Sequence, residues 1–308
     1  MQRKVQIYTI SIAVFFTAIL FFSFSKDSKV YKTKGLFPGQ KPPIAQIVEP
    51  IPMGSDYTFA DEQLPLDNFD VKERLERELT VNTYWHSSTV LNLKRAGRYF
   101  PMFEQIFAEE GVPDDCKYIA VAESNLMNVS SPAGARGLWQ FMKGAAQEYG
   151  LEVNKEVDER YHLEKATRAA CKYLKRLKNK FGSWTMAAAA YNVGATKLKR
   201  EAEIQRSNNY YDLNLNEETG RYIFRIVAIK ELVNHPLQFG YQIDKEDYYA
   251  PLDDFSIVTV EKSIENLGDF AKKYGISYRM LKVYNPWLRS DKLTNKKHKT
   301  YYIKIPKG

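Results

Sequence analysis

Apolar residues in the middle of the chain recur every three or four positions, the spacing of an α-helix that buries one face. The pattern opens with Val71, Leu75 and Leu79. The same period predicts further helices over residues 90–107, 113–126, 164–181, 185–191 and 219–233. Gly111 is expected to end one of these helices, and Pro113 to begin the next. Because no long alternating strand interrupts residues 67–236, we predict an all-α domain.

The C-terminal residues follow a different pattern. Residues 255–260 are β-rich and residues 301–305 alternate, whereas residues 264–274 and 278–284 have helical spacing. This order predicts a compact α+β module with the arrangement βααβ. Residues 253–308 also carry twelve Lys and Arg against six Asp and Glu, so this part holds +6 of the net charge of +8. That charge indicates either a solvated face or a surface that adheres to an anionic polymer.

The N-terminal residues have the composition of a membrane-spanning segment. Arg3 and Lys4 precede twenty uncharged residues, 6–25, a length that crosses a bilayer as a helix. The two cations favour a cytoplasmic N-terminus, which places everything after Lys26 outside the cytoplasm, on the periplasmic side. A cleaved signal peptide is the alternative, although FFSFSKDS is a poor cleavage site. In both cases the body is exported, which argues against nucleic acid as a partner despite the basic charge.

Residues 26–66 contain six prolines without a sustained period, which is typical of an extended linker. The expected organisation is therefore a membrane anchor or signal segment at 1–25, a linker at 26–66, a helical domain at 67–248 with its core at 84–234, and the α+β module at 253–308.

Composition narrows the chemistry. The chain has 308 residues, of which 44% are hydrophobic, enough for a packed core and too many for wholesale disorder. Its two Cys exclude a disulfide-rich scaffold, and its four His lie far apart, so neither a metal nor a cofactor is predicted. Cys116 and Cys171 each lie in an amphipathic helical pattern, which favours two free thiols over a disulfide.

One carboxylate has an unusual setting. Glu123 follows Ile119, Ala120 and Val121 near the end of an apolar helix. Burial there would raise its pKa, so that it could hold a proton near neutral pH. A protonated carboxylic acid in a cleft is what cleavage of a glycosidic bond requires. A single Glu on a helix is more often a surface residue, so this signal needs support from other segments.

Three later segments give that support. They read SPAGARGLWQFM at 131–142, AAAAYN at 187–192 and ETGRY at 218–222. Each combines aromatic, amide or small residues, and such a set suits a sugar, because rings stack on pyranose faces and amides bond hydroxyl and acetamido groups. Taken singly, each segment could equally be ordinary core or turn.

In this order, the motifs Glu123–Ser124, Gly137–Gln140 (GLWQ), Ala190–Asn192 (AYN) and Tyr222 resemble those of the lytic murein transglycosylases. The resemblance is strongest to the membrane-bound D type, which carries LysM repeats, and it runs over residues 84–234 and 255–306. It implies a lysozyme-like α domain, similar to that of soluble lytic transglycosylases and goose-type lysozyme. Such a domain cleaves the MurNAc–GlcNAc β-1,4 bond of peptidoglycan strands.

The resemblance also implies roles for the residues. Glu123 would protonate the glycosidic oxygen and then act as base on the sugar's 6-hydroxyl, while the MurNAc acetamido group stabilises C1. The product is a 1,6-anhydro ring, with no water consumed. The substrate-binding residues would be Ser124, Gly137, Gln140, Phe141, Tyr191, Asn192 and Tyr222. No second carboxylate is expected beside Glu123.

Structural readings of some of these residues stay open. Ser124 could cap its helix, Gln140 could stabilise the glycine-rich turn, and Tyr222 could belong to the core. Two other functions also stay open. A hydrolytic muramidase would need a carboxylate from Asp114, Asp115 or Asp158, and a non-catalytic wall-binding protein would not need Glu123 at all.

The tail departs from the LysM pattern. Its opening, TVEKSIENLGDFAKKYGIS, lacks the usual GDT turn, and its close, KHKTYYIKIP, lacks the usual Gly. The middle segment LKVYNPWL resembles the second LysM helix and its Asn-Pro. The resemblance therefore predicts the βααβ fold of the tail but does not support binding of GlcNAc polymers by it.

Overall fold

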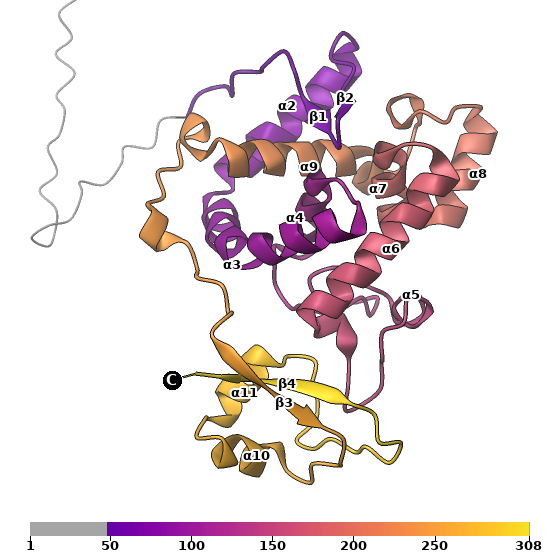
Figure 1. Ribbon diagram of the computed structural model, residues 1–308. Coiled ribbons are helices and arrows are strands. Elements are labelled where there is room, and N and C mark those ends of the chain that lie inside the picture. Colours follow the sequence, from indigo (N-terminus) through magenta and orange to yellow (C-terminus); the bar gives the residue numbers. More distant parts are fainter. Residues whose placement is uncertain (1–47, 308) are drawn as a thin grey trace, which may run out of the picture. The chain divides into compact units, whose positions relative to one another are not determined.

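The computed structural model describes residues 48–307 (Figure 1). The expected anchor at residues 1–25 and most of the expected linker lie outside this range. Within it, none of the helices is both long enough and apolar enough to traverse a bilayer. Residues from Pro50 onward form one compact unit.

The helical part contains the expected helices in the expected order, and two helices that were not expected. They are α2 (Phe69–Tyr84), α3 (His86–Glu110), α4 (Lys117–Ser124), α5 (Lys143–Glu148), α6 (Leu163–Phe181), α7 (Trp184–Val193), α8 (Ala195–Gln205) and α9 (Glu217–Asn234). α9 packs against α2, α4 and α7, and α6 lies along α7 and α3 (Figure 1). The prediction of a mainly α domain is confirmed.

Local signals in the sequence set the helix ends. Asn68, Ser183 and Asn216 each accept a hydrogen bond from a backbone N–H of the first turn of their helix, which satisfies a donor that the helix leaves open. Gly111 ends α3 in the left-handed conformation, as expected. Two helices were not anticipated: α5 is short, and α8 buries only Leu198 and Ala202, too few apolar positions for a period to stand out.

The linker prediction was wrong for residues 50–66. Strands β1 (Thr58–Phe59) and β2 (Glu62–Gln63) form a hairpin, and Tyr57, Phe59 and Leu64 are buried in the main core. The backbone N–H of Ala60 donates to Asp115 Oδ2 at 2.7 Å. Prolines on both sides hid this segment, because a strand of two residues shows no alternation in the sequence.

The tail has the predicted βααβ fold. Strands β3 (Phe255–Val260) and β4 (Tyr301–Pro306) pair antiparallel, from Phe255 opposite Pro306 to Val260 opposite Tyr301. Helices α10 (Leu267–Lys273) and α11 (Tyr278–Tyr284) connect them. Leu267, Leu281, Trp287 and Ile303 are buried in a core separate from that of the helical domain.

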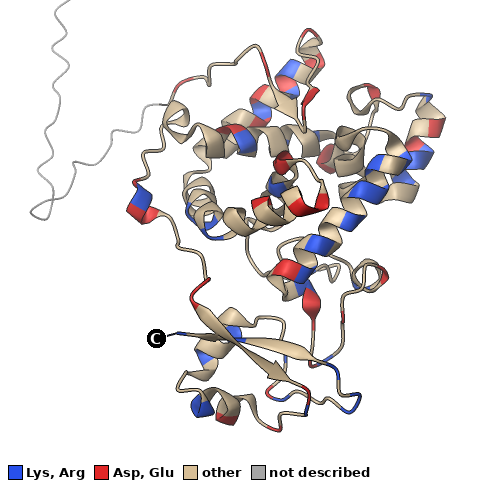
Figure 2. Ribbon diagram, viewed as in Figure 1, with Lys and Arg blue, Asp and Glu red and all other residues tan. Residues whose placement is uncertain are grey.

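This small core also takes in two residues of the helical domain, Val157 and Tyr161. The backbone N–H of Asp158 donates to Trp287 O at 2.9 Å, and that of Arg289 donates to Glu156 O at 2.7 Å. Lys304 of β4 also forms an ion pair with Glu164, at the start of α6. Backbone pairing, apolar burial and an ion pair therefore hold the tail against residues 156–164. Figure 2 shows the Lys and Arg residues of the tail, and also a row of Lys and Arg residues along α6.

Cys116 and Cys171 are both buried and free, as predicted. Burial raises the pKa of the Cys171 thiol to about 12, which keeps it in the thiol form. Each therefore behaves as a small apolar core residue.

The placement of residues 50–66 can be tested with two phenylalanines. Phe59→Ala should lower the free energy of unfolding by about 3–5 kcal/mol, because it leaves a cavity in the core. Phe69→Ala should change it by less than about 0.5 kcal/mol, because Phe69 is 74% exposed. Urea unfolding measures both, and equal effects would mean that the hairpin does not belong to the core.

Candidate active site

Glu123 lies in the last turn of α4, where the backbone reverses direction. Asn125 and Leu126 have φ values of +51° and +55°, a conformation that a bulky residue adopts only when its surroundings impose it. The Asn125 N–H donates to Val121 O at 2.8 Å, its side chain accepts from Asn92, and its carbonyl accepts from Arg95. This turn fixes where α4 ends and therefore where the Glu123 carboxyl lies.

The Glu123 carboxyl receives a short hydrogen bond from α9. The hydroxyl of the buried Tyr222 donates to Glu123 Oε1 at 2.5 Å. The pKa of Glu123 is raised from its ordinary 4.5 to about 7, first of all by burial; the Tyr222 hydrogen bond lowers it, nearby Glu218 raises it, and Arg225 lowers it. The negative end of the α4 dipole acts in the raising direction too. Glu123 can therefore hold a proton at neutral pH.

A buried carboxylate on α2 holds the helix that carries Tyr222. Glu78 is fully buried, and it accepts from Arg221 Nε at 2.6 Å and lies 3.6 Å from Arg225 Nε. A buried charge of this kind is stable only when it is paired. The pairing fixes α9 against α2. The negative charge of Glu78 also offsets part of the effect that the positive charge of Arg225 has on Glu123.

Tyr191 lies on the α7 side of Glu123. Its hydroxyl donates to Trp139 O at 2.7 Å. Burial raises the pKa of Tyr191 well above its ordinary value, and the charge of Glu123 raises it further. Tyr191 is therefore a neutral side chain within electrostatic reach of the carboxyl, as the expected grouping of Glu123, Tyr191 and Tyr222 requires.

Asn192 meets the first turn of α9. Its Oδ1 accepts from Thr219 Oγ1 at 2.8 Å, and its Nδ2 donates to Glu218 Oε1 at 3.4 Å. The amide is therefore oriented by α9. The exposed Glu218 also acts electrostatically on Glu123. The expectation that no second carboxylate accompanies Glu123 was wrong. The sequence already contained this carboxylate, because Glu218 stands four residues before Tyr222 in the same motif.

Ser124 faces the protein. Its hydroxyl lies 2.9 Å from Ala120 O and 2.8 Å from Leu138 O, and the side chain is 5% exposed. Ser124 thereby ties the end of α4 to the glycine-rich segment. Direct contact of Ser124 with the sugar stays a prediction.

Gly137, Gln140 and Phe141 shape the glycine-rich segment itself. Gly137 has φ +80°, and a Cβ there would lie 2.0 Å from Arg160 O, so only glycine fits. Gln140 Nε2 donates to Gly137 O at 2.7 Å, the turn-stabilising role that stayed open above. Phe141 is buried and packs against Tyr173 and Tyr191. Gly137 and Phe141 are buried, and substrate contact stays a prediction for both of them and for Gln140.

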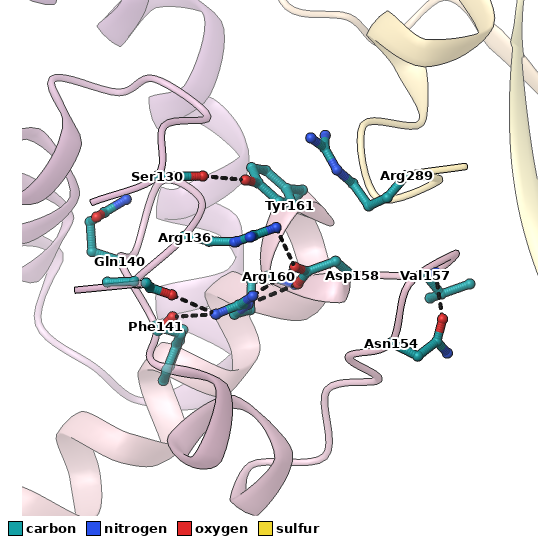
Figure 3. Close-up of polar contacts among 12 residues, drawn as sticks. Ser130, Arg136, Gln140, Phe141, Asn154, Val157, Asp158, Arg160, Tyr161 and Arg289 are labelled. Carbon is teal, nitrogen blue, oxygen red and sulfur yellow. Dashed lines mark hydrogen bonds and ion pairs between the residues drawn. The ribbon is translucent and has the colours of Figure 1, made fainter. Parts of the chain in front are cut away.

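A buried ion pair, which sequence reasoning missed, supports the same segment (Figure 3). Arg160 Nη1 donates to Gly134 O at 3.0 Å and to Phe141 O at 3.1 Å, while Asp158 holds the guanidinium at 2.7 and 2.8 Å. Next to it, Tyr161 OH and Ser130 Oγ lie 2.9 Å apart. The spacing Asp-x-Arg was the only sequence signal of this ion pair, and the spacing is too common in proteins to indicate a buried pair.

The carboxylates named for a muramidase are engaged by cations elsewhere. Asp158 pairs with Arg160, Asp114 with Lys117 at 2.6 Å, and Asp115 with Lys230 at 2.7 Å. The exposed Glu218, which acts electrostatically on Glu123, forms no such pairing with Lys or Arg within residues 48–307. Over residues 48–307, no cluster of three or more His, Cys, Asp and Glu has the form of a metal site.

Comparison with known families fits this geometry. Residues 102–214 match the transglycosylase SLT domain, and residues 256–308 match the soluble lytic transglycosylase C-terminal LysM-like domain. Along the chain, the match to the SLT domain is therefore followed by the match to the LysM-like domain.

Among individual proteins, the chain is similar to membrane-bound lytic murein transglycosylase D from two strains of Escherichia coli, with 24% identity over 265 residues. The match covers 83% of this chain and 56% of the relative, so the chain spans about half the length of the curated relatives it matches.

Two solved structures are also similar. An inactive mutant of the lytic transglycosylase Slt from Pseudomonas aeruginosa has a TM-score of 0.38 and 20% identity, covering 49% of this chain and 26% of that one. The 70 kDa soluble lytic transglycosylase of Escherichia coli has a TM-score of 0.40 and 17% identity, covering 60% of this chain and 36% of that one.

The raised pKa of Glu123 predicts a pH-dependent stability difference. Between its ordinary value of 4.5 and its folded value of about 7, the folded chain keeps a proton that the unfolded chain loses, so this contribution to stability disappears as the pH rises through 7. Glu123→Gln, which stays neutral, should be more stable than the wild type at pH 8 by on the order of 1–3 kcal/mol. At pH 4.5 the two should be close.

Urea unfolding at the two pH values measures this difference. Glu203→Gln is the control, because Glu203 is 62% exposed on α8. If the difference between Glu123→Gln and the wild type were the same at both pH values, Glu123 would not titrate abnormally in the folded chain.

Proposed function

We propose that this chain cleaves the MurNAc–GlcNAc β-1,4 bond of peptidoglycan without consuming water, leaving 1,6-anhydroMurNAc ends. The observation that carries the proposal is the setting of Glu123, a carboxyl with a pKa of about 7 that receives a hydrogen bond from Tyr222. The SLT domain match and the similarity to a murein transglycosylase support the same substrate.

In the first step Glu123 would act as general acid. Its proton passes to the glycosidic oxygen as the bond from that oxygen to C1 of MurNAc breaks, and the released chain end leaves with a new hydroxyl. The carbonyl oxygen of the MurNAc acetamido group bonds to C1 and takes up the positive charge. Tyr222 stabilises the carboxylate that Glu123 becomes.

In the second step the same carboxylate would act as base. It takes the proton of the MurNAc 6-hydroxyl while that oxygen bonds to C1 and displaces the acetamido oxygen. Glu123 ends protonated, as it began, and no water enters the product. A pKa near the working pH serves both steps, because the group must give and take a proton in turn. Tyr191 and Asn192 would border the sugar.

The second candidate is a hydrolytic muramidase, which the position of Glu218 favours. This carboxylate is exposed, acts on Glu123 electrostatically and accepts from Asn192. It could activate a water molecule on the far side of C1, as in glycosidases with two carboxylates. Glu218→Gln would then lose nearly all activity, whereas the elimination mechanism needs Glu218 only to tune Glu123.

We also propose that the uncharged residues 6–25 anchor the chain in a membrane, with the enzyme on the periplasmic side. The pattern of charge and hydropathy in the sequence supports this placement, and the relative is named as membrane-bound. Peptidoglycan strands would then be the macromolecular partner.

The products released from purified peptidoglycan separate the two mechanisms. The wild type should release muropeptides lighter by one water than those from a hydrolytic lysozyme, and mass spectrometry detects this difference directly. Glu123→Gln should reduce release at least about a thousandfold, since it removes both acid and base. Reducing-end products from the wild type would establish the muramidase instead.

The pH dependence of kcat/KM should report the ionisation of Glu123. The rate should fall above about pH 7, because the acid form is lost as the pH passes its pKa. Tyr222→Phe removes a hydrogen bond to the charged form, so the pKa should rise and the alkaline limb should move to higher pH. Tyr302→Phe, at an exposed position of β4, should leave the limb in place. A limb unmoved in Tyr222→Phe would mean that another group sets it.

A further inference from the structure

A strongly basic cavity is lined in part by residues that follow Glu123 closely in the chain. It has a volume of about 620 Å³ and is lined by α3, by residues 126–128 and by the tail. Five cations border it: Arg95, Arg98, Arg279, Lys282 and Arg289. Among residues 48–307, no Asp or Glu belongs to its lining. The helical domain and the tail thus contribute to one concave, positively charged site.

Within residues 48–307, these cations have no close pairing with carboxylates, although the charge of Asp291 acts on Lys282. Over residues 48–307, none of the five forms an ion pair within 4.0 Å. Their hydrogen bonds go to backbone carbonyls instead: Arg95 to Asn125 O at 3.1 Å, Arg98 to Ala250 O at 3.0 Å, and Lys282 to Leu288 O at 2.6 Å. Such bonds orient a cation without cancelling its charge, so the cavity keeps a positive potential.

The ionisation of Lys282 reflects its burial first and the neighbouring charges second. Burial and the charge of Arg289 lower its pKa to about 8, and the charge of Asp291 acts in the opposite direction. An anion in the cavity would relieve both effects. Arg279 is exposed at the cavity edge, with its guanidinium free to meet a ligand.

The position of the cavity connects it with the glycan site. Residues 126–128, which line it, begin three residues after Glu123, and Arg95 at its wall binds the carbonyl of the turn that ends α4. A ligand in the cavity would therefore lie beside the same turn that holds Glu123. The part of the substrate next to the glycan backbone is the peptide stem, which carries free carboxylates.

We propose that this cavity binds the carboxylates of a peptidoglycan peptide stem, an inference that rests on the proposed function. Guanidinium groups bind carboxylates through paired, charge-assisted hydrogen bonds. Four of the five cations are guanidiniums, those of Arg95, Arg98, Arg279 and Arg289. The volume admits a few amino acid residues and is too small for a nucleic acid duplex. The tail would thus recognise the stem instead of the glycan, which agrees with its missing LysM binding turn.

The test uses the full chain and a defined probe, the free tripeptide L-alanyl-γ-D-glutamyl-diaminopimelate. Isothermal titration calorimetry should detect binding, and converting the tripeptide carboxylates to amides should weaken it at least tenfold. Arg279→Gln should weaken it roughly five- to tenfold, the effect of one charged hydrogen bond. The matched control is Lys272→Gln, the same loss of charge at an exposed position of α10 outside the cavity lining, and it should bind as the wild type does.

Several results would overturn the proposal. Absence of tripeptide binding by the wild type, equal binding of the amide form, or equal effects of Arg279→Gln and Lys272→Gln would each do so. Binding of anionic lipid vesicles that depends on Arg279, without tripeptide binding, would assign the cavity to a membrane surface instead.

Cleavage assays test the proposed enzyme function separately from the binding of the stem. Cleavage of glycan strands stripped of their stems should proceed equally in the wild type and in Arg279→Gln, whereas cleavage of strands with stems should show a raised KM in the variant alone. A chain that cleaves neither substrate but binds the tripeptide would contradict the enzyme function and leave the cavity assignment standing.

Discussion

The chemistry proposed for this protein depends on the environment of one carboxyl group. Burial at the end of α4 raises the pKa of Glu123 to about 7, and the Tyr222 hydroxyl at 2.5 Å limits the rise. Without burial the carboxyl would be ionised at neutral pH and could not act as an acid. Without the Tyr222 hydroxyl its ionised form would be less stable. Because it would give and take a proton in turn, its environment must favour neither form strongly.

Much of the surrounding structure serves to hold that environment. The left-handed turn at Asn125 ends α4, and Ser124 ties it to the glycine-rich segment. That segment is braced by Arg160, which binds two of its carbonyls. Residues next to Arg160 pack on the tail: Tyr161 lies in the tail's core and under Arg289, whose guanidinium carbon is 4.2 Å from the ring centre. The LysM-like tail is thus a structural support of the loop that carries GLWQ, besides forming one wall of the basic cavity.

The sequence allowed the helices, the βααβ tail and the central carboxyl to be predicted, because helical period and an acid among apolar neighbours are local signals. What it could not predict depended on side-chain direction or on distant partners. Ser124 and Phe141 both belong to the motifs that the sequence singled out, but both residues are buried in the protein. Arg160 and Asp158 meet the glycine-rich segment from about twenty residues away in the chain, and the hairpin at residues 58–63 is too short to show alternation.

The most direct measurement is the ionisation of Glu123 itself. Carbon-13 NMR of the full chain labelled at glutamate carboxyl carbons, with the Glu123 signal assigned by its absence in Glu123→Gln, would follow this group from pH 4 to pH 9. The predicted result is a midpoint near pH 7, the pKa that burial and Tyr222 together set. A midpoint near 4.5, the value of an exposed glutamate, would contradict the central role given to this carboxyl as an acid.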